Sequence, residues 1–234
     1  SGAISVGTGT ATGGRGGVLT LTIGEGNSGT GGIMRMYAGD SSAATGGAMY
    51  VESGHSSLSS SGLIQIRTAN AGTSGRSGLL SFSSGSTTKG NSGSLFIGSG
   101  DAAVGRGGSI TLTVGNGDSG NGGSINAIAG RTSDSATGGH LEIASGESSA
   151  TSSGDLHIYT ANAGTAGISG MLVFSSGTST SGNSGAISVG TGTATGGRGG
   201  ALTLTVGEGN SGTGGIMRMY AGDSSAATGG AMYI

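Results

Sequence analysis

The chain has 234 residues, of which 58 are glycine, and it contains no proline, cysteine or tryptophan. Only 9% of its residues are charged, with a formal net charge of -2, whereas an average globular domain has about 25% charged residues. This composition excludes collagen, which needs proline and a Gly-X-Y period, as well as disulfide frameworks and thiolate metal sites. It also excludes a basic surface for nucleic acid, and no apolar run approaches the roughly 20 residues that span a membrane.

A short tandem repeat begins at Ala3. Residues 3–17 read AISVGTGTATGGRGG, residues 18–32 read VLTLTIGEGNSGTGG, and similar segments of 15 or 16 residues continue to residue 230. We call each segment a rung and number its positions from its first residue. The sequence also has a longer period of 183 residues. Residues 184–234 repeat residues 1–51 with three substitutions. Fixed periods of this kind indicate a repeat architecture.

Positions 2 and 4 of the rungs are apolar, and the residues around them are mostly polar. Such alternation is typical of a half-buried strand. Identical rungs stacked about 4.8 Å apart would align these side chains into apolar ladders. The sequence therefore predicts an all-β fold, a thin, flattened parallel β-solenoid of about 15-residue rungs with no helices. In the first six rungs the predicted ladders are Ile4, Leu19, Met34, Met49, Ile64 and Leu80 at position 2, and Val6, Leu21, Met36, Val51, Ile66 and Phe82 at position 4.

Glycine marks two predicted corners in each rung. One lies at position 7, which is nearly always glycine, and the other at the end of the rung, which is Gly-Gly or Ser-Gly. We expect residues 1–234 to form one continuous array with sub-repeats 3–93, 94–185 and 186–234. Since the array begins and stops partway through a rung, we expect it to be a window on a longer repeat region.

Charged side chains give few candidates for chemistry. Glu25 and Asp40 occupy position 8 of consecutive rungs and form a weak candidate pair for a hard cation, although solvated corner residues are the simpler interpretation. Glu142 and His157 occupy position 3 of consecutive rungs, where a surface ion pair is expected. No nucleophile accompanies them. The sequence therefore predicts no catalytic residues, no cofactor and no enzyme activity.

Two segments carry a resemblance to known proteins. Residues 1–17 and 184–200 both read SGAISVGTGTATGGRGG, which resembles the Gly/Ser-rich tandem repeats of secreted, cell-surface or adhesive β-solenoid proteins from diatoms and related algae. This resemblance implies an extracellular fibre or adhesive and brings no catalytic residues with it.

We therefore expect a structural, filament-forming repeat protein at the cell surface or in an extracellular matrix. Its expected partner is itself, by axial stacking of subunits or within one very long chain, with lateral bundling of fibres; polysaccharides or other surfaces are further expected partners. Two alternatives remain open. One is an ice-binding or other crystal-binding solenoid, suggested by the pairs Thr20/Thr22, Thr111/Thr113 and Thr203/Thr205. The other is a spacer stalk that carries terminal domains.

Overall fold

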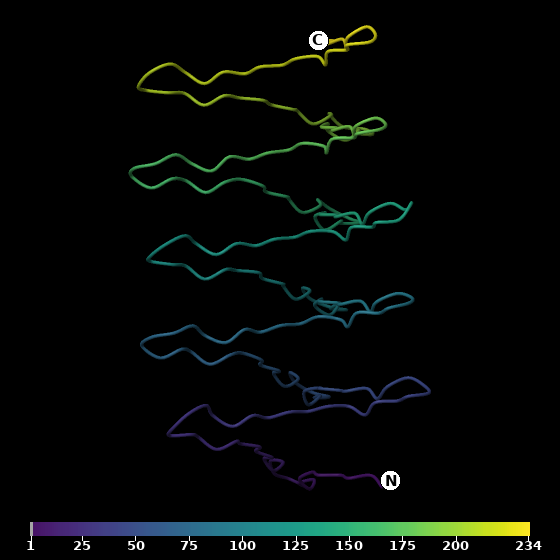
Figure 1. The fold of residues 1–234 in the computed structure, drawn as a ribbon, viewed down its shortest axis with the longest axis vertical. Coiled ribbons are helices and arrows are strands. Elements are labelled where there is room, and N and C mark those ends of the chain that lie inside the picture. Colours follow the sequence, from purple (N-terminus) through teal and green to yellow (C-terminus); the bar gives the residue numbers. More distant parts are fainter. Residues whose placement is uncertain (1) are drawn as a thin grey trace. The chain divides into compact units, whose positions relative to one another are not determined.

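The computed structural model describes residues 2–234, and in this range it contains neither a helix nor a β-strand. Figure 1 accordingly shows a continuous trace without arrows or coils. The chain divides into two units, Ser1–Thr113 and Val114–Ile234. The expected regular secondary structure is therefore absent from the described residues, and the order in the chain is local to each rung.

Every rung forms a loop that closes on itself. The backbone bends sharply near positions 10 to 13. Figure 1 shows a trace that turns back on itself repeatedly along the chain. The last glycine of the rung returns to the residue at position 6. We call this glycine the neck glycine, and the fifteen of them are Gly17, Gly32, Gly47, Gly62, Gly78, Gly93, Gly108, Gly123, Gly139, Gly154, Gly170, Gly185, Gly200, Gly215 and Gly230.

The neck glycines allow the two sides of the loop to approach closely. A Cβ atom added to any of them would lie within 4 Å of the residue at position 6 of the same rung. At Gly17 it would lie 3.1 Å from the Cβ of Thr8, and at Gly108 it would lie 3.1 Å from the Cβ of Ser99. Such contacts are tighter than those of ordinary side chains, so only a residue without a Cβ permits this approach without a local shift.

Ten of the loops turn at a glycine with a positive φ angle, and we call them glycine loops. Gly29 has φ 94° and Gly90 has φ 99°, a region that costs residues with a Cβ about 1–2 kcal/mol. In four glycine loops a hydroxyl at position 6 donates to the carbonyl oxygen of the neck glycine. The donors are Thr8 (3.4 Å), Ser99 (2.9 Å), Thr160 (3.1 Å) and Thr191 (3.3 Å).

The other five loops contain no glycine with positive φ, and we call them capped loops. In each, the hydroxyl oxygen of Ser or Thr at position 9 accepts backbone N–H groups of the bend, as the Oγ of Ser148 does from Thr151 at 2.9 Å. The hydroxyl oxygen takes the place of a backbone carbonyl as acceptor for the N–H groups of the bend. It therefore stabilises the bend without a residue in the left-handed conformation. In each, the backbone N–H of the neck glycine also donates to the glycine carbonyl at position 7, over 2.8–2.9 Å. The capped loops are Gly39–Gly47, Gly54–Gly62, Gly130–Gly139, Gly146–Gly154 and Gly222–Gly230.

The two kinds of loop follow the long period of the sequence. Two glycine loops, two capped loops and two further glycine loops form a six-rung order that recurs along the chain, so that four glycine loops separate successive pairs of capped loops. Loop type is therefore encoded within positions 8 to 13 of each rung: the glycine loops contain a turn glycine, and the capped loops lack it and have a hydroxyl at position 9.

The prediction of an all-β parallel solenoid is wrong. Among the described residues, the backbone hydrogen bonds lie within single rungs, and five of the six cross a loop neck instead of joining consecutive rungs. Loop closure over eight or nine residues requires less ordering than pairing over a whole rung, because closure entropy rises with loop length. Glycine also disfavours strands, since it has high backbone entropy and no side chain for cross-strand packing.

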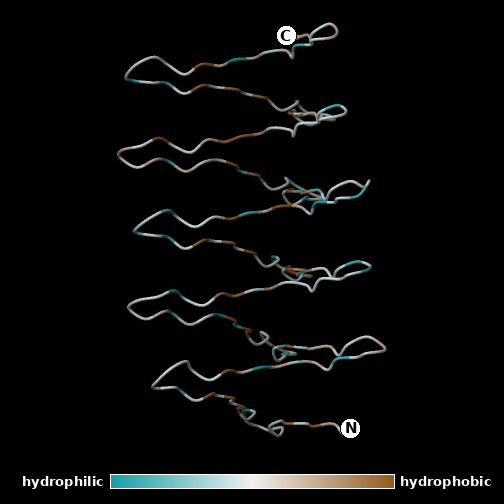
Figure 2. Ribbon diagram, in the orientation of Figure 1, coloured by the Kyte–Doolittle hydropathy of each residue, from teal (hydrophilic) through white to brown (hydrophobic). Residues whose placement is uncertain are grey.

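Solvent exposure leads to the same correction. No described residue is buried, and the accessible surface is 23332 Å². A folded monomer of 21.7 kDa would expose about 9,000 Å², and its unfolded chain about 31,000 Å². Figure 2 shows the apolar residues as short stretches separated by paler loop segments. The chain is therefore a series of local loops without a hydrophobic core in the part that the structure describes.

We predict that far-ultraviolet circular dichroism of residues 1–234 shows neither a helical nor a sheet spectrum. Most amides should exchange with solvent at nearly unprotected rates, because few of them are hydrogen-bonded. Hydrogen exchange followed by mass spectrometry checks this expectation. Uniform slow exchange along positions 1 to 5 of the rungs would contradict the loop structure and would support pairing between rungs.

A second prediction concerns the neck. Gly123→Ala places a methyl group against Cγ1 of Val114, whereas Gly122→Ala meets nothing within 4 Å. Because Val is stiff at χ1, it does not yield easily, and we expect Gly123→Ala to disfavour closure by about 1 kcal/mol or more. The nuclear Overhauser effect between the Val114 methyls and residue 123 should then be lost. It should remain in Gly122→Ala, and equal signals in both variants would refute the role of the neck glycine.

Candidate functional site

The candidate cation pair lies on two loops of different kinds. Glu25 belongs to the glycine loop of its rung, and Asp40 follows the first glycine of the capped loop Gly39–Gly47. Both residues are exposed. Within residues 2–234 no group of three or more His, Cys, Asp or Glu side chains is placed to hold a metal ion. The pair therefore has no third protein ligand, although Ca²⁺ takes six to eight oxygen ligands.

His157 pairs within its own rung and not with the neighbouring one. Its Nε2 lies 3.9 Å from the Oδ2 of Asp155, and both side chains are highly exposed. Asp155 and His157 are two residues apart in an extended segment, which places their side chains on the same side of the backbone. The expected pair of Glu142 and His157 is not formed. An exposed pair of this kind contributes little to stability.

The twelve side chains of the predicted ladders are all exposed, from 46% for Leu80 to 93% for Ile4. The structure therefore leaves the side chains of the predicted ladders open to solvent.

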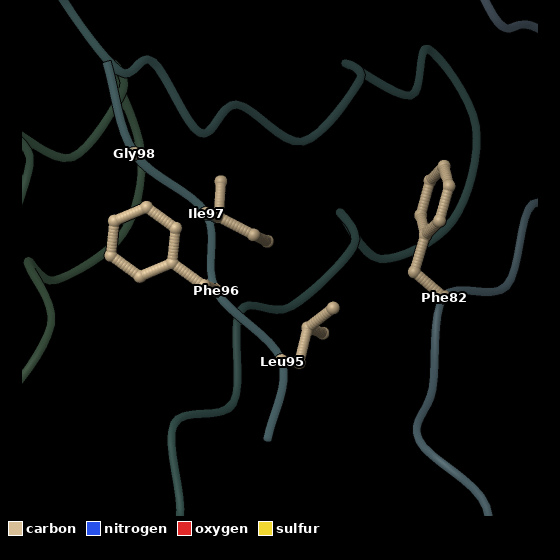
Figure 3. Close-up of a pocket in the computed structure, with 5 residues that line it drawn as sticks. All are labelled: Phe82, Leu95, Phe96, Ile97 and Gly98. Atoms are coloured by element: carbon tan, nitrogen blue, oxygen red, sulfur yellow. The ribbon is translucent and has the colours of Figure 1, made fainter. Parts of the chain in front are cut away.

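An apolar recess lies where two consecutive rungs meet. It has a volume of about 460 Å³ and is lined by Phe82, Leu95, Phe96, Ile97 and Gly98. Figure 3 shows Leu95 and Ile97 on the side of the chain that faces Phe82, while Phe96 points to the other side. Leu95 and Ile97 are positions 2 and 4 of their rung, and they face Phe82 at position 4 of the preceding rung. The Phe82 side chain remains 59% exposed.

The recess has no polar side chain to orient a ligand. Small-molecule sites usually combine an apolar wall with a few converging polar groups. A second recess of about 310 Å³ is lined by Arg67, Thr68, Ala69 and Asn70, which are consecutive residues of one exposed segment. Neither recess brings together a nucleophile, a base and an oxyanion donor.

The features that sequence reasoning missed are the loop closures. The neck glycines were identified only as corners, and their partners at position 6 were not identified. The signal for capped loops was present, since Ser41, Ser56, Thr132, Ser148 and Ser224 occupy position 9 in the rungs that lack a turn glycine.

No helix among the described residues is long and apolar enough to cross a membrane. Comparison with known families, characterised proteins and solved structures shows no match. Inference about function therefore rests on the repeat, the loops and the exposed side chains of this chain itself.

Proposed function

We propose that this chain is a structural repeat protein that associates with copies of itself in an extracellular filament or adhesive matrix. Its role is mechanical: the chain supplies length and many equivalent contacts. The near-identity of residues 1–51 and 184–234 supports this role. A repeated surface multiplies weak contacts along a fibre, and a single binding site would not require such regularity.

The observation that carries the proposal is the regular exposure of paired apolar side chains. Every rung presents a large apolar residue at position 2, and every rung except 124–139, which has Ala127, presents another at position 4. These residues lie between loops that are rich in glycine and hydroxyl groups. Extensive apolar exposure indicates an interaction surface, because burial of apolar area is favourable on association. Two chains with the same rung length can match these pairs over many successive rungs.

Charge presents little obstacle to this association. The net charge is -2 over 234 residues, so long-range repulsion between copies is weak. The loops add Ser and Thr hydroxyls, which can donate and accept hydrogen bonds with water or with the hydroxyl groups of polysaccharides. We therefore propose an extracellular location and contacts with polysaccharide or with other fibres.

We predict that residues 1–234 self-associate reversibly and that sulfate, which strengthens apolar burial, increases association. The triple substitution Leu19→Ser, Met34→Ser and Met49→Ser removes three position-2 side chains that are 48–55% exposed. It should raise the concentration needed for association by about tenfold or more, since each side chain contributes a fraction of its full transfer free energy. Sedimentation velocity measures the change, and negative-stain electron microscopy shows whether the assemblies are filaments.

The matched control removes three apolar side chains from loop bends. Leu58→Ser, Val104→Ser and Ile168→Ser replace residues that are 96–98% exposed, and this variant should associate like the original chain. A chain that stays monomeric at high concentration would refute the proposal. Equal weakening by the two triple variants would refute the role of positions 2 and 4.

A further inference from the structure

The two kinds of loop differ in how their necks are held. In a capped loop, the neck is closed by a backbone hydrogen bond, and the bend is held by a position-9 hydroxyl. In the glycine loops, no backbone hydrogen bond is found across the neck within the described residues. Four of them use a single hydroxyl, over distances of 2.9–3.4 Å.

The conformational entropy lost on closure also disfavours the glycine loops relative to the capped loops. A glycine loop must fix an additional glycine at its bend, and glycine loses more conformational freedom on ordering than any other residue. The capped loops contain Ala, Ser or Thr in place of this glycine, namely Ala44, Ser59, Ser135, Thr151 and Ala227. Fewer hydrogen bonds and a larger entropy loss both favour opening of the glycine loops.

We infer that the chain is an extensible array with two grades of loop closure, in which glycine loops open before capped loops. This inference rests on the proposed structural role. It states which rungs supply additional length when the fibre is stretched. Closed necks bring together residues nine or ten positions apart, and a segment of nine residues extends to about 30 Å when it is pulled straight. Opening each loop therefore releases roughly 25 Å of chain.

The glycine loops, which release chain length when they open, are spread along the whole array. Runs of four glycine loops alternate with pairs of capped loops. The runs supply length at low tension, and the capped pairs remain closed between them. When the tension is removed, the loops close again and the chain shortens without a partner molecule.

Loop closure can be measured directly because the chain contains no cysteine. Two necks provide a matched pair, since each joins a serine at position 6 to a neck glycine nine residues later. A Cβ on Gly154 would lie 3.7 Å from the Cβ of Ser145 in a capped loop, and a Cβ on Gly185 would lie 3.6 Å from the Cβ of Ser176 in a glycine loop. Both distances suit a disulfide.

The test compares Ser145→Cys/Gly154→Cys with Ser176→Cys/Gly185→Cys in otherwise identical chains. Each is equilibrated with reduced and oxidised glutathione, and the fraction of disulfide gives the effective concentration of one thiol near the other. We expect this value to be about fivefold higher in the capped loop, as one additional net hydrogen bond would produce. Equal values, or a higher value in the glycine loop, would overturn the inference.

Substitutions at the bend test whether the position-9 hydroxyl causes the difference in effective concentration between the two loops. Ser148→Ala removes the hydroxyl that accepts from Thr151 at 2.9 Å, and it should lower the effective concentration toward that of the glycine loop. Ser149→Ala removes the neighbouring hydroxyl, which makes no such bond, and should change little. An equal effect of both substitutions would overturn the role of the cap. The measurement uses dilute monomer, so its outcome does not depend on whether the chain assembles into filaments.

Discussion

The close approach of the chain at each neck glycine is the constraint on which the other features depend. At Gly17, Gly47 and Gly108 an added Cβ would lie 3.1 Å from atoms across the neck. At ten of the fifteen necks an added Cβ would lie closer than 3.4 Å to an atom of the facing segment. The absence of a side chain therefore lets these rungs close within themselves, and the backbone polar groups that bond do so locally. Because closure is local, the rungs have no need to pair with one another, and the segments between loops remain extended and unpaired.

This local closure explains how a chain without a buried core can still be regular. Each rung closes at its neck glycine, and the presence or absence of a turn glycine follows a six-rung order along the sequence. The apolar residues at positions 2 and 4 then lie outside the loops at a chain spacing of 15 or 16 residues. Regular exposure of this kind suits association of one chain with another, whereas a buried ladder would leave little apolar surface for contacts between copies.

The sequence predicted some local features correctly and their spatial partners incorrectly. Alternation at Leu95 and Ile97 correctly placed both side chains on one side of the backbone (Figure 3). The same alternation wrongly predicted strands, because an extended segment has a period of two whether or not it pairs with a neighbour. Likewise, Glu142 and His157 occupy equivalent rung positions, but His157 pairs with Asp155, since equivalent positions meet only when rungs stack.

The sequence by itself determined the rung length, the 183-residue period, and which positions are apolar, hydroxylic or glycine. These are properties of residue order and need no three-dimensional information. Only the tertiary structure decided which groups meet: the neck glycine with position 6, the Ser148 hydroxyl with the Thr151 amide, and Phe82 with the following rung. The physical reason is that a repeat of small residues permits closure either within a rung or between rungs. The balance between backbone entropy and hydrogen bonding, which composition does not specify, selects between them.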